Sequence, residues 1–378
     1  MTIPAGIYLT GTIWLRDNVE LHLEHASILK ASGDMNDYNP SDAYPQNWDC
    51  VHEEWLGKHL IIVHETTGSA LTGTGTIDGS ADLFLGDIME TIGYCWRDGI
   101  ARSRDKDILR PGQLICFIEC VDVTVRDVTL RNMPCWGLYL YGCENLTVRG
   151  LRVFNPPYYA NSDGIDIDTC HNVTVSDCII DTADDAIAIR ASCKRLTRRK
   201  FTVCEYVTIS NCVLSSSSSV FRIGVGTGKI RHIRASNLVF GRGETGMNFQ
   251  TDFAGVGSVD MEDVNFSNIS AEGLAYPVAV WESNGSYIRN ITIENYRAEC
   301  IAELRMIAAH KDTVSDITIR NCDFKVKKES VNDKSLCECK NINRLELDNV
   351  KIKDSDGGSE TERYHFTACT GSFNGKQI

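Results

Sequence analysis

A five-residue pattern recurs along most of this chain: apolar, polar, apolar, any residue, and then usually Asn or Asp. Each copy alternates apolar and polar positions, which is the period of a β-strand with one buried face. Successive copies begin 23 to 34 residues apart. They occupy residues 123–127, 146–150, 173–177, 207–211, 233–237, 264–268, 291–295, 317–321 and 345–349.

The residue that ends each copy, such as Asp177 or Asn268, predicts a tight bend, because an apolar residue always follows it. Asn and Asp tolerate left-handed backbone and hydrogen-bond their own main chain. Stacked at one corner of successive coils, they could also form a ladder of side-chain amides. A unit this short buries its apolar face only by stacking on its neighbours. The pattern therefore predicts an all-β fold, a parallel β-helix. An ankyrin or leucine-rich array would need a helix or a leucine pattern that the chain lacks.

The first 115 residues fit earlier and less regular coils, so we expect residues 1–378 to form one β-helix domain. Two segments without this pattern, about 33–57 and 82–111, predict long loops that wall a binding groove. Strand-like sequence begins at Thr2, although a solenoid needs a cap on each end. We therefore expect a short N-terminal cap or a missing upstream segment.

The charge balance restricts the partners of the chain. A formal net charge of −13 argues against nucleic-acid binding, because phosphates would have to be neutralised along a groove. The basic run at residues 194–200 is short and isolated, and a solvated loop is its simplest interpretation. No apolar run approaches the roughly 20 residues that cross a bilayer. We expect no nucleic-acid partner, no membrane partner and no cofactor.

The sixteen cysteines mostly occupy apolar positions near strand edges, as Cys178 does, and there they resemble small buried hydrophobic residues. The chain shows no secretory signal, so we expect reduced thiols and a cytoplasmic location. A secreted or periplasmic location is the alternative if an upstream signal has been lost. Cys337 and Cys339 alone make a poor zinc signature.

The densest acidic stretch is residues 161–190. Asp163 and Asp184 are 21 residues apart, about one coil, so we expect Asp163 and the pair Asp184–Asp185 to face one groove from adjacent coils. Glycosidic hydrolysis needs one protonated carboxyl and one carboxylate, and neighbouring carboxylates raise one another's pKa. A bound Ca²⁺ or a polar ladder without chemistry is the alternative. Asp166 and Asp168 fall on the outward face, and we expect Asp168 to be merely solvated.

Several short motifs resemble glycoside hydrolase family 28, the polygalacturonases and their relatives. The most specific are Asn161-Ser-Asp163-Gly, similar to the family's Asn-Thr-Asp, and the paired Asp184–Asp185. The resemblance covers nearly the whole chain. It also includes residues 3–8, 73–79, 110–111, 134–136 and 155–156.

The resemblance implies a right-handed, single-stranded, pectin lyase-like β-helix and an inverting hydrolase without a metal. In that family pattern Asp184 is the general acid, and Asp163 and Asp185 activate the attacking water. Asn161 helps to orient the site. The implied substrate is a pectin-derived or related carbohydrate.

Two family motifs are altered, and the change predicts a different sugar. Ser219 stands at the histidine of the family's Gly-His-Gly, and Asn248 and Gln250 stand at the two cations of its Arg-Ile-Lys. An amide side chain is better suited to bind a sugar hydroxyl than to bind a sugar carboxylate. We therefore expect rhamnogalacturonan or a side-chain sugar instead of plain homogalacturonan. Arg222 either replaces part of the lost charge or pairs with a carboxylate of the cluster.

Four further residues are weaker substrate-binding candidates. Tyr158 and Tyr159 lie in the loop that leads to the aspartates, and Trp281 and Glu282 stand where a strand opens into a turn. Aromatic rings can stack on sugars, although Trp281 could equally pack between coils. Three more tryptophans could wall one end of the groove and favour cleavage at chain ends: Trp48, Trp55 and Trp96.

Two other functions are compatible with the sequence. The first is a Ca²⁺-dependent polysaccharide lyase, in which the aspartates bind the metal and an arginine such as Arg190 is the base. The second is a carbohydrate-binding β-helix without catalysis. The loss of the two cations weighs against the lyase, and the three retained aspartates weigh against pure binding.

Overall fold

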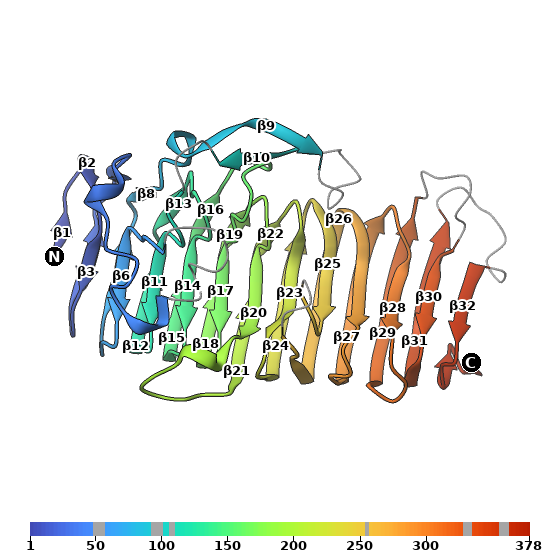
Figure 1. The fold of residues 1–378 in the computed structure, drawn as a ribbon. Helices are drawn as coiled ribbons and strands as arrows, with labels where there is room; N and C mark the ends of the chain where they lie inside the picture. Colours follow the sequence, from blue (N-terminus) through green and yellow to red (C-terminus); the bar gives the residue numbers. More distant parts are fainter. Residues whose placement is uncertain (48–56, 92–100, 106–109, 254–256, 328–334, 355–362) are drawn as a thin grey trace.

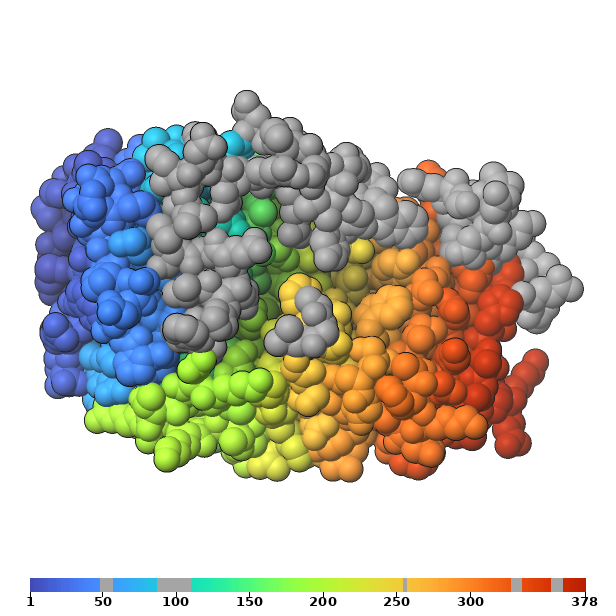
Figure 2. All heavy atoms as spheres, viewed as in Figure 1, coloured from blue at the N-terminus to red at the C-terminus, as the bar shows by residue number. Residues whose placement is uncertain are grey.

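The computed structural model describes residues 1–47, 57–91, 101–105, 110–253, 257–327, 335–354 and 363–378. The chain winds into a parallel β-helix, with its coils stacked in sequence order from the N-terminus at one end to the C-terminus at the other (Figure 1). In the space-filling view the coils form one continuous body (Figure 2). This confirms the fold class that the repeat predicts.

Each coil contributes a strand to each of three parallel sheets. The first sheet contains β3 (Ile13–Leu15), β6 (Ile61–His64), β11 (Ile115–Ile118), β14 (Leu138–Tyr141), β17 (Ile165–Asp168), β20 (Ile187–Ala191), β23 (Ser219–Gly226), β25 (Gly243–Gln250), β28 (Leu304–Ala308), β30 (Cys337–Lys340) and β32 (Tyr364–Thr367). The second contains β1 (Thr2–Ile3), β4 (Glu20–Leu23), β7 (Ala70–Gly73), β12 (Val121–Arg126), β15 (Glu144–Arg149), β18 (His171–Ser176) and β21 (Val203–Ser210). The third contains β2 (Gly6–Thr10), β5 (Ser27–Ala31), β8 (Thr76–Asp78), β13 (Thr129–Arg131), β16 (Arg152–Phe154), β19 (Ile179–Asp181) and β22 (Val213–Ser215).

In the C-terminal half, long strands bend from the second sheet into the third. These are β24 (Lys229–Phe240), β26 (Asp260–Glu282), β27 (Ile288–Cys300), β29 (Val314–Val326) and β31 (Ile342–Asp354). The end of β26 continues into the first sheet, where it pairs with β25 and β28. The last strands are β33 (Gly371–Phe373) and β34 (Lys376–Gln377), which pair antiparallel.

The nine copies of the repeat lie in register. The first residue of each copy pairs with the first residue of the next, as Val123 does with Leu146 and Ile291 with Ile317. The last residue of every copy has a positive φ, between 49° and 66°. The side-chain amides of Asn211, Asn237, Asn268 and Asn295 are joined one to the next at 3.1–3.3 Å. The predicted bends and the predicted amide ladder are both present.

The interior is a continuous apolar column. It is filled by the inward residues of all three sheets, of which Leu71, Phe117 and Val175 are examples. All fourteen cysteines that the structure describes are free thiols, and twelve of them are buried. They pack as the small hydrophobic residues that the sequence predicts.

The two predicted loops differ from the prediction in part. Segment 33–57 holds two 3₁₀ turns, η1 (Met35–Asp37) and η2 (Pro45–Asn47). Segment 82–111 is not a plain loop: after η3 (Ala81–Leu83), β9 (Leu85–Thr91) and β10 (Ala101–Asp105) pair as an antiparallel hairpin that crosses one side of the stack (Figure 1). The period of the solenoid is absent there because the hairpin forms a separate sheet.

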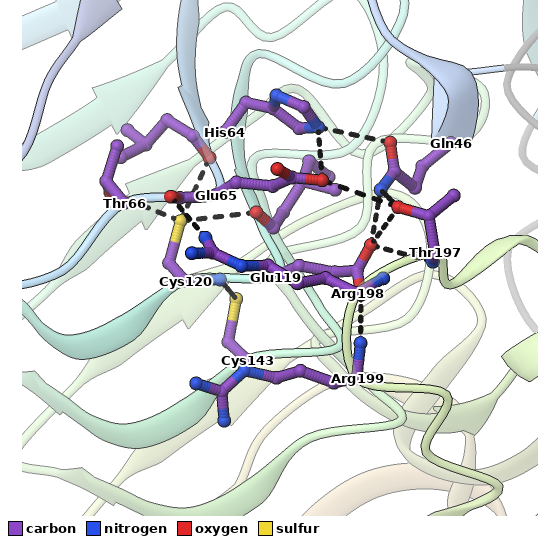
Figure 3. Close-up of polar contacts among 12 residues, drawn as sticks. Gln46, His64, Glu65, Thr66, Glu119, Cys120, Cys143, Thr197, Arg198 and Arg199 are labelled. Atoms are coloured by element: carbon purple, nitrogen blue, oxygen red, sulfur yellow. Dashed lines mark hydrogen bonds and ion pairs between the residues drawn. The ribbon is translucent and has the colours of Figure 1, made fainter.

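The basic run begins in η5 (Cys193–Arg195) and continues into the loop that follows, and the buried carboxylate of Glu119 holds that loop (Figure 3). Backbone N–H groups of Thr197, Arg198 and Arg199 donate to this carboxylate at 2.7–2.9 Å, and Gln46 also donates to it. Lys194 and three other cations of the run are exposed, as expected, while the backbone is fixed.

The N-terminal coil exposes apolar side chains at the end of the stack. Ile7 is 72% exposed and Leu9 is 70% exposed, because both lie on the outward face of β2, opposite Ile28 and Lys30 of β5, and no strand that the structure describes pairs with the other edge of β2. None of the helices in the described part of the chain is long and apolar enough to cross a membrane.

Candidate active site

The outward face of the first sheet carries the candidate residues in columns, because equivalent positions of successive coils pair directly. One column runs Tyr139, Asp166, Ala188, Arg222, Asn248 and Ala279. Stacked strands are about 4.8 Å apart, so neighbours in a column are within contact distance.

Asp163 and Asp184–Asp185 lie in the turns that enter β17 and β20. One carboxylate oxygen from each of the three lies within 4.8 Å of the others. Asp163 and Asp185 are 4% and 2% exposed, and Asp184 is half-buried. The one-coil spacing therefore brings the three carboxylates together, as the sequence predicts.

Tight packing between the two turns fixes this approach. The Gly164 N–H donates to the Asp185 carbonyl at 2.9 Å. A Cβ at position 164 would lie 2.5 Å from the carbonyl oxygen of Ala186, so only glycine fits there. Hydroxyls of Thr182 and Ser216 donate to the Asp184 carbonyl at 2.8 and 2.7 Å and hold the second turn.

The electrostatics of the cluster favour a retained proton. Burial raises the pKa of Asp163 well above its ordinary value, and the nearby Asp166, Asp184 and Asp185 add to this, while Arg190 opposes it. Burial also raises the pKa of Asp185, against the lowering effect of Arg222. Five carboxylates and two guanidinium groups in one site cannot all be ionised without cost.

The altered motifs form a hydrogen-bonded unit beside Asp185. The Ser219 N–H donates to Asp185 Oδ1 at 3.2 Å, and the Asn248 amide donates to Ser219 Oγ at 3.1 Å. Arg222 donates to Asp185 Oδ2 at 3.2 Å and to Gln250 Oε1 at 2.6 Å. Of the two alternatives for Arg222, the structure has the pairing with a cluster carboxylate.

Asn161 is held by Arg110 at the start of the turn that carries Asp163. Its backbone is left-handed, with φ 53°, and its Oδ1 accepts from Arg110 Nη2 at 2.6 Å. Arg110 Nη1 also donates to the carbonyls of Pro134 and Ala160 at 3.1 and 2.7 Å. Arg110, which was quoted above only as part of a motif, is thus a support of this turn that sequence reasoning missed.

The expectation that Asp168 is solvated is wrong. Asp168 is 1% exposed and accepts from the Ser192 N–H at 2.6 Å, and Asp166 is fully buried against Arg190 Nη1 at 3.3 Å. The Arg190 guanidinium lies 4.2 Å from the centre of the Trp136 ring. Outward positions are buried here because loops cover the sheet. The alternation of apolar and polar residues along a strand does not predict such a cover.

The weaker candidates divide into two groups. Tyr158 and Tyr159 pack against each other and against Ala81 and Leu85, beneath the hairpin segment. Trp281 is half-buried on the groove face, with the Arg305 guanidinium 5.1 Å from its ring.

The Glu282 carboxylate is buried among the backbone and side chains of the turns that follow β26 and β28. It is 2% exposed and accepts from the N–H groups of Gly285 and His310 at 2.6 and 3.0 Å, and from the Thr313 hydroxyl at 2.9 Å. The loop tryptophans Trp48, Trp55 and Trp96 lie outside the described residues.

On the N-terminal side of the aspartates, the first sheet is covered. Tyr44 and Leu196 pack onto the outward residues Trp136, Tyr139 and Tyr141 in one buried cluster. Toward the C-terminus, Trp281 and Arg305 remain partly exposed. The outward face of the first sheet is therefore covered on the N-terminal side of the aspartates and more open toward the C-terminus.

Comparison with known proteins adds the family context. The family model for glycosyl hydrolases family 28 matches residues 46–370. A probable polygalacturonase of Vitis vinifera is 26% identical over 304 residues, which are 76% of this chain and 56% of the relative. An endo-polygalacturonase of Pectobacterium carotovorum subsp. carotovorum is 24% identical over 278 residues, which are 73% of this chain and 65% of the relative. This chain thus spans under two thirds of each relative's length.

Two solved structures share the right-handed β-helix. The hyperthermoactive exopolygalacturonase of Thermotoga maritima has a TM-score of 0.71 and 22% identity, and the match covers 93% of this chain and 83% of that one. The family 28 exopolygalacturonase of Yersinia enterocolitica also has a TM-score of 0.71, at 16% identity, with 100% and 73% covered.

Proposed function

Because this chain belongs to glycosyl hydrolases family 28, we propose that it hydrolyses glycosidic bonds in pectin-derived or related carbohydrates. The observation that carries the proposal is the cluster of Asp163, Asp184 and Asp185, whose oxygens lie within 4.8 Å of one another. Half-buried Asp184 is the general acid that protonates the leaving oxygen. Asp185, which pairs with Arg222, removes the proton of the attacking water, and Asp163 helps to hold that water toward the anomeric carbon.

The stereochemical outcome of this mechanism is inversion, as the family resemblance implies. Inverting enzymes usually separate acid and base by roughly 6.5–9.5 Å, so that water fits between them. The shorter spacing here requires the water to lie beside the cluster. NMR of the first-formed anomer measures the outcome, and a product with retained configuration would contradict inversion.

The proposed sugar at the cleaved bond is neutral, such as the rhamnose of rhamnogalacturonan or a side-chain sugar. The charges of the arginines on this face are compensated: Arg222 pairs with Asp185, and Arg190 lies between Asp166 and Asp168. Arg305, farther along the sheet, pairs with Glu303 and Glu338 at 3.4 Å. A uronate carboxylate needs a cation whose charge is not already used. Ser219 and Asn248 offer polar groups that suit hydroxyls.

Cleavage is proposed to occur at chain ends. The side chains that cover the first sheet on the N-terminal side of the aspartates, including Tyr44 and Leu196, support this. A chain-end enzyme releases short products from the first turnover and lowers viscosity slowly. An enzyme that cleaves internally lowers viscosity fast.

A panel of homogalacturonan, rhamnogalacturonan and side-chain oligosaccharides, with analysis of the sugars released, tests the proposal. We expect turnover of a substrate with a neutral sugar at the cleaved bond and little turnover of homogalacturonan. Fastest turnover of homogalacturonan would contradict the sugar, but not hydrolysis. No turnover of any member would contradict hydrolysis.

The Ca²⁺-dependent lyase stays as the second candidate, because the three carboxylates are close enough to share a cation. Against it, Arg190 is buried in contact with Asp166 and Trp136, which leaves it poorly suited to act as a base. Lyase products absorb in the ultraviolet, and a chelator stops their formation. Unsaturated products that disappear with EDTA would replace the hydrolase by the lyase.

The cytoplasmic location is likewise a proposal. Buried free thiols such as Cys143 and Cys170 suit a reducing compartment. Fractionation of cells that express the native gene measures the location, and recovery outside the cytoplasm would contradict it.

A further inference from the structure

The Arg222 guanidinium is hydrogen-bonded to side chains of the candidate site. Arg222 lies on β23, is 8% exposed, and its two terminal nitrogens bind Asp185 Oδ2 at 3.2 Å and Gln250 Oε1 at 2.6 Å. The centre of its guanidinium lies 4.9 Å from the centre of the Phe253 ring. A planar guanidinium held at two nitrogens and against a ring has little freedom to move.

Asp185 is fixed from both sides. One carboxylate oxygen contacts Arg222, and the other accepts from the Ser219 N–H at 3.2 Å and the Ser218 hydroxyl at 3.4 Å. Among the described residues, Asp163 has no such hydrogen bond to its carboxylate. The two proposed water-activating carboxylates are therefore unequal.

We propose that Arg222 is a positioning residue that orients Asp185 as its counter-ion, and that Gln250 and Phe253 in turn fix Arg222. This inference rests on the proposed function, because water activation by Asp185 is part of it. It assigns Gln250 to the support of the site, instead of to contact with the sugar.

The charges around Asp185 make Arg222 its direct counter-ion. Asp184 lies in the same turn, Asp163 and Asp166 face it from the preceding coil, and Arg222 faces it from the next. Burial and Asp184 raise the pKa of Asp185, and Arg222 lowers it. Without Arg222, Asp185 would hold its proton to higher pH and could not accept one from water.

Kinetics of Arg222→Gln and Arg222→Lys, on the oligosaccharide that the wild type hydrolyses, test the proposal. For Arg222→Gln we expect kcat to fall about tenfold or more, with KM nearly unchanged, and the acid limb of kcat/KM to move to higher pH. We expect Arg222→Lys to keep part of the wild-type kcat and to show a smaller shift of the acid limb. Arg320→Gln, which breaks an exposed pair with Glu294, is the matched control and should change neither.

A different pattern would overturn the inference. If KM rises while kcat and the pH profile stay unchanged, Arg222 contacts the substrate instead of positioning Asp185. Should Arg222→Gln fail to fold, Gln250→Leu removes one of the two hydrogen bonds to the guanidinium and should shift the acid limb in the same direction, by less. An unshifted limb in Gln250→Leu would overturn the support assigned to Gln250.

Thermal unfolding separates this inference from the proposed function, because it needs no substrate. We expect Arg222→Gln to lower the midpoint in the wild-type background, and to lower it less, or to raise it, in an Asp185→Asn background. Equal shifts in both backgrounds would show that the pair is not coupled. If the wild type hydrolyses nothing in the panel, the proposed function fails. The four unfolding midpoints of this double-mutant cycle still measure the coupling between Arg222 and Asp185.

Discussion

Asp163 is a carboxylate in which burial and like charge combine. It is 4% exposed, and Asp166, Asp184 and Asp185 all act to raise its pKa beyond the effect of burial. An acid whose pKa is raised on folding adds stability at low pH and loses it as the pH rises. The site is therefore a strained feature of the fold near neutral pH.

Replacing Asp163 by Asn should stabilise the protein near neutral pH. The native pKa lies above the unfolded value of about 3.9, so the cost of this carboxyl grows as the pH rises from there toward the native pKa. We expect a midpoint about 1–3 °C above the wild type at pH 7 and a smaller gain at pH 4. Calorimetry at both pH values measures this, and a gain that grows in acid would contradict it.

Replacing Asp184 by Asn should remove turnover and leave binding intact. The amide keeps the size of the side chain but cannot donate a proton to the leaving oxygen. We expect kcat to fall by about 10²–10⁴-fold, with an unchanged circular dichroism spectrum. Titration calorimetry with the same oligosaccharide is the control for binding, and wild-type activity in this variant would end the proposed mechanism.

Sequence reasoning reached the residues of the site unevenly. The spacing of Asp163 and Asp184 predicted their approach, because the number of residues in a coil converts directly into position. It missed the burial of Asp168 and the internal role of Glu282, because both depend on which loops and turns cover an outward side chain. The role of Gln250 was missed because its partner, Arg222, lies one coil away in space.

Among the elements, the bend between the second and third sheets is the most regular. Asn268 has φ 57°, donates to Asn237 at 3.2 Å and accepts from Asn295 at 3.1 Å. Left-handed backbone costs a side chain with a Cβ about 1–2 kcal/mol, which Asn offsets better than Ala. The backbone strain of the left-handed bend and the side-chain hydrogen bonds of the amide ladder therefore both affect stability at Asn268.

Two substitutions of Asn268 separate these contributions. Asn268→Gly loses the ladder bonds but accepts the positive φ, whereas Asn268→Ala loses both. We expect Ala to be less stable than Gly by about 1 kcal/mol in urea unfolding. Asn265→Ala, on the same strand β26 and without a positive φ, is the control and should cost less than Asn268→Ala. Equal stability of the Gly and Ala variants would mean that the bend is unstrained.

The loop after β20 depends on one buried carboxylate. Glu119 accepts from three consecutive backbone N–H groups, those of residues 197–199 (Figure 3). Hydrogen bonds to a carboxylate are stronger than those to a neutral amide. We therefore expect this loop to be less ordered when residue 119 carries no negative charge.

Glu119→Gln should loosen this loop. The amide has one acceptor oxygen where the carboxylate has two, so at least one N–H of residues 197–199 loses its partner. We expect trypsin to cleave within residues 194–200 several-fold faster in this variant than in the wild type. Mass spectrometry of the fragments measures the rate and the site of cleavage. Glu346→Gln, on the exposed face of β31, is the matched control. Unchanged cleavage would mean that the loop is held without Glu119.

The elements were predictable where they repeat. All nine copies of the pattern are strands in register, since each copy buries its apolar residues only by lying on the last. The hairpin of β9 and β10 was not predicted, because its strands pair locally and outside the main sheet. The long interval between the copies at residues 173 and 207 reflects the loop that Glu119 holds.

At the level of the whole molecule, one rigid stack brings together parts with different tasks. Tyr44 of an N-terminal coil and Leu196 of the loop after β20 cover the first sheet, the middle coils carry the carboxylates, and the next coils carry Asn248 and Trp281. Because the coils are in register, a change of loop length leaves these columns aligned. The groove can vary its walls without moving its carboxylates.

The unbroken register between coils also makes the length of the groove discrete. Each coil adds one outward position to every column, at a step of about 4.8 Å. A chain that gained one complete coil between Asn248 and Trp281 would keep its ladder and its core, and would lengthen the row of outward side chains by one such step. A deletion of one residue within a strand would instead reverse which side chains face outward. Heritable changes in the reach of this groove are therefore expected to come as whole coils.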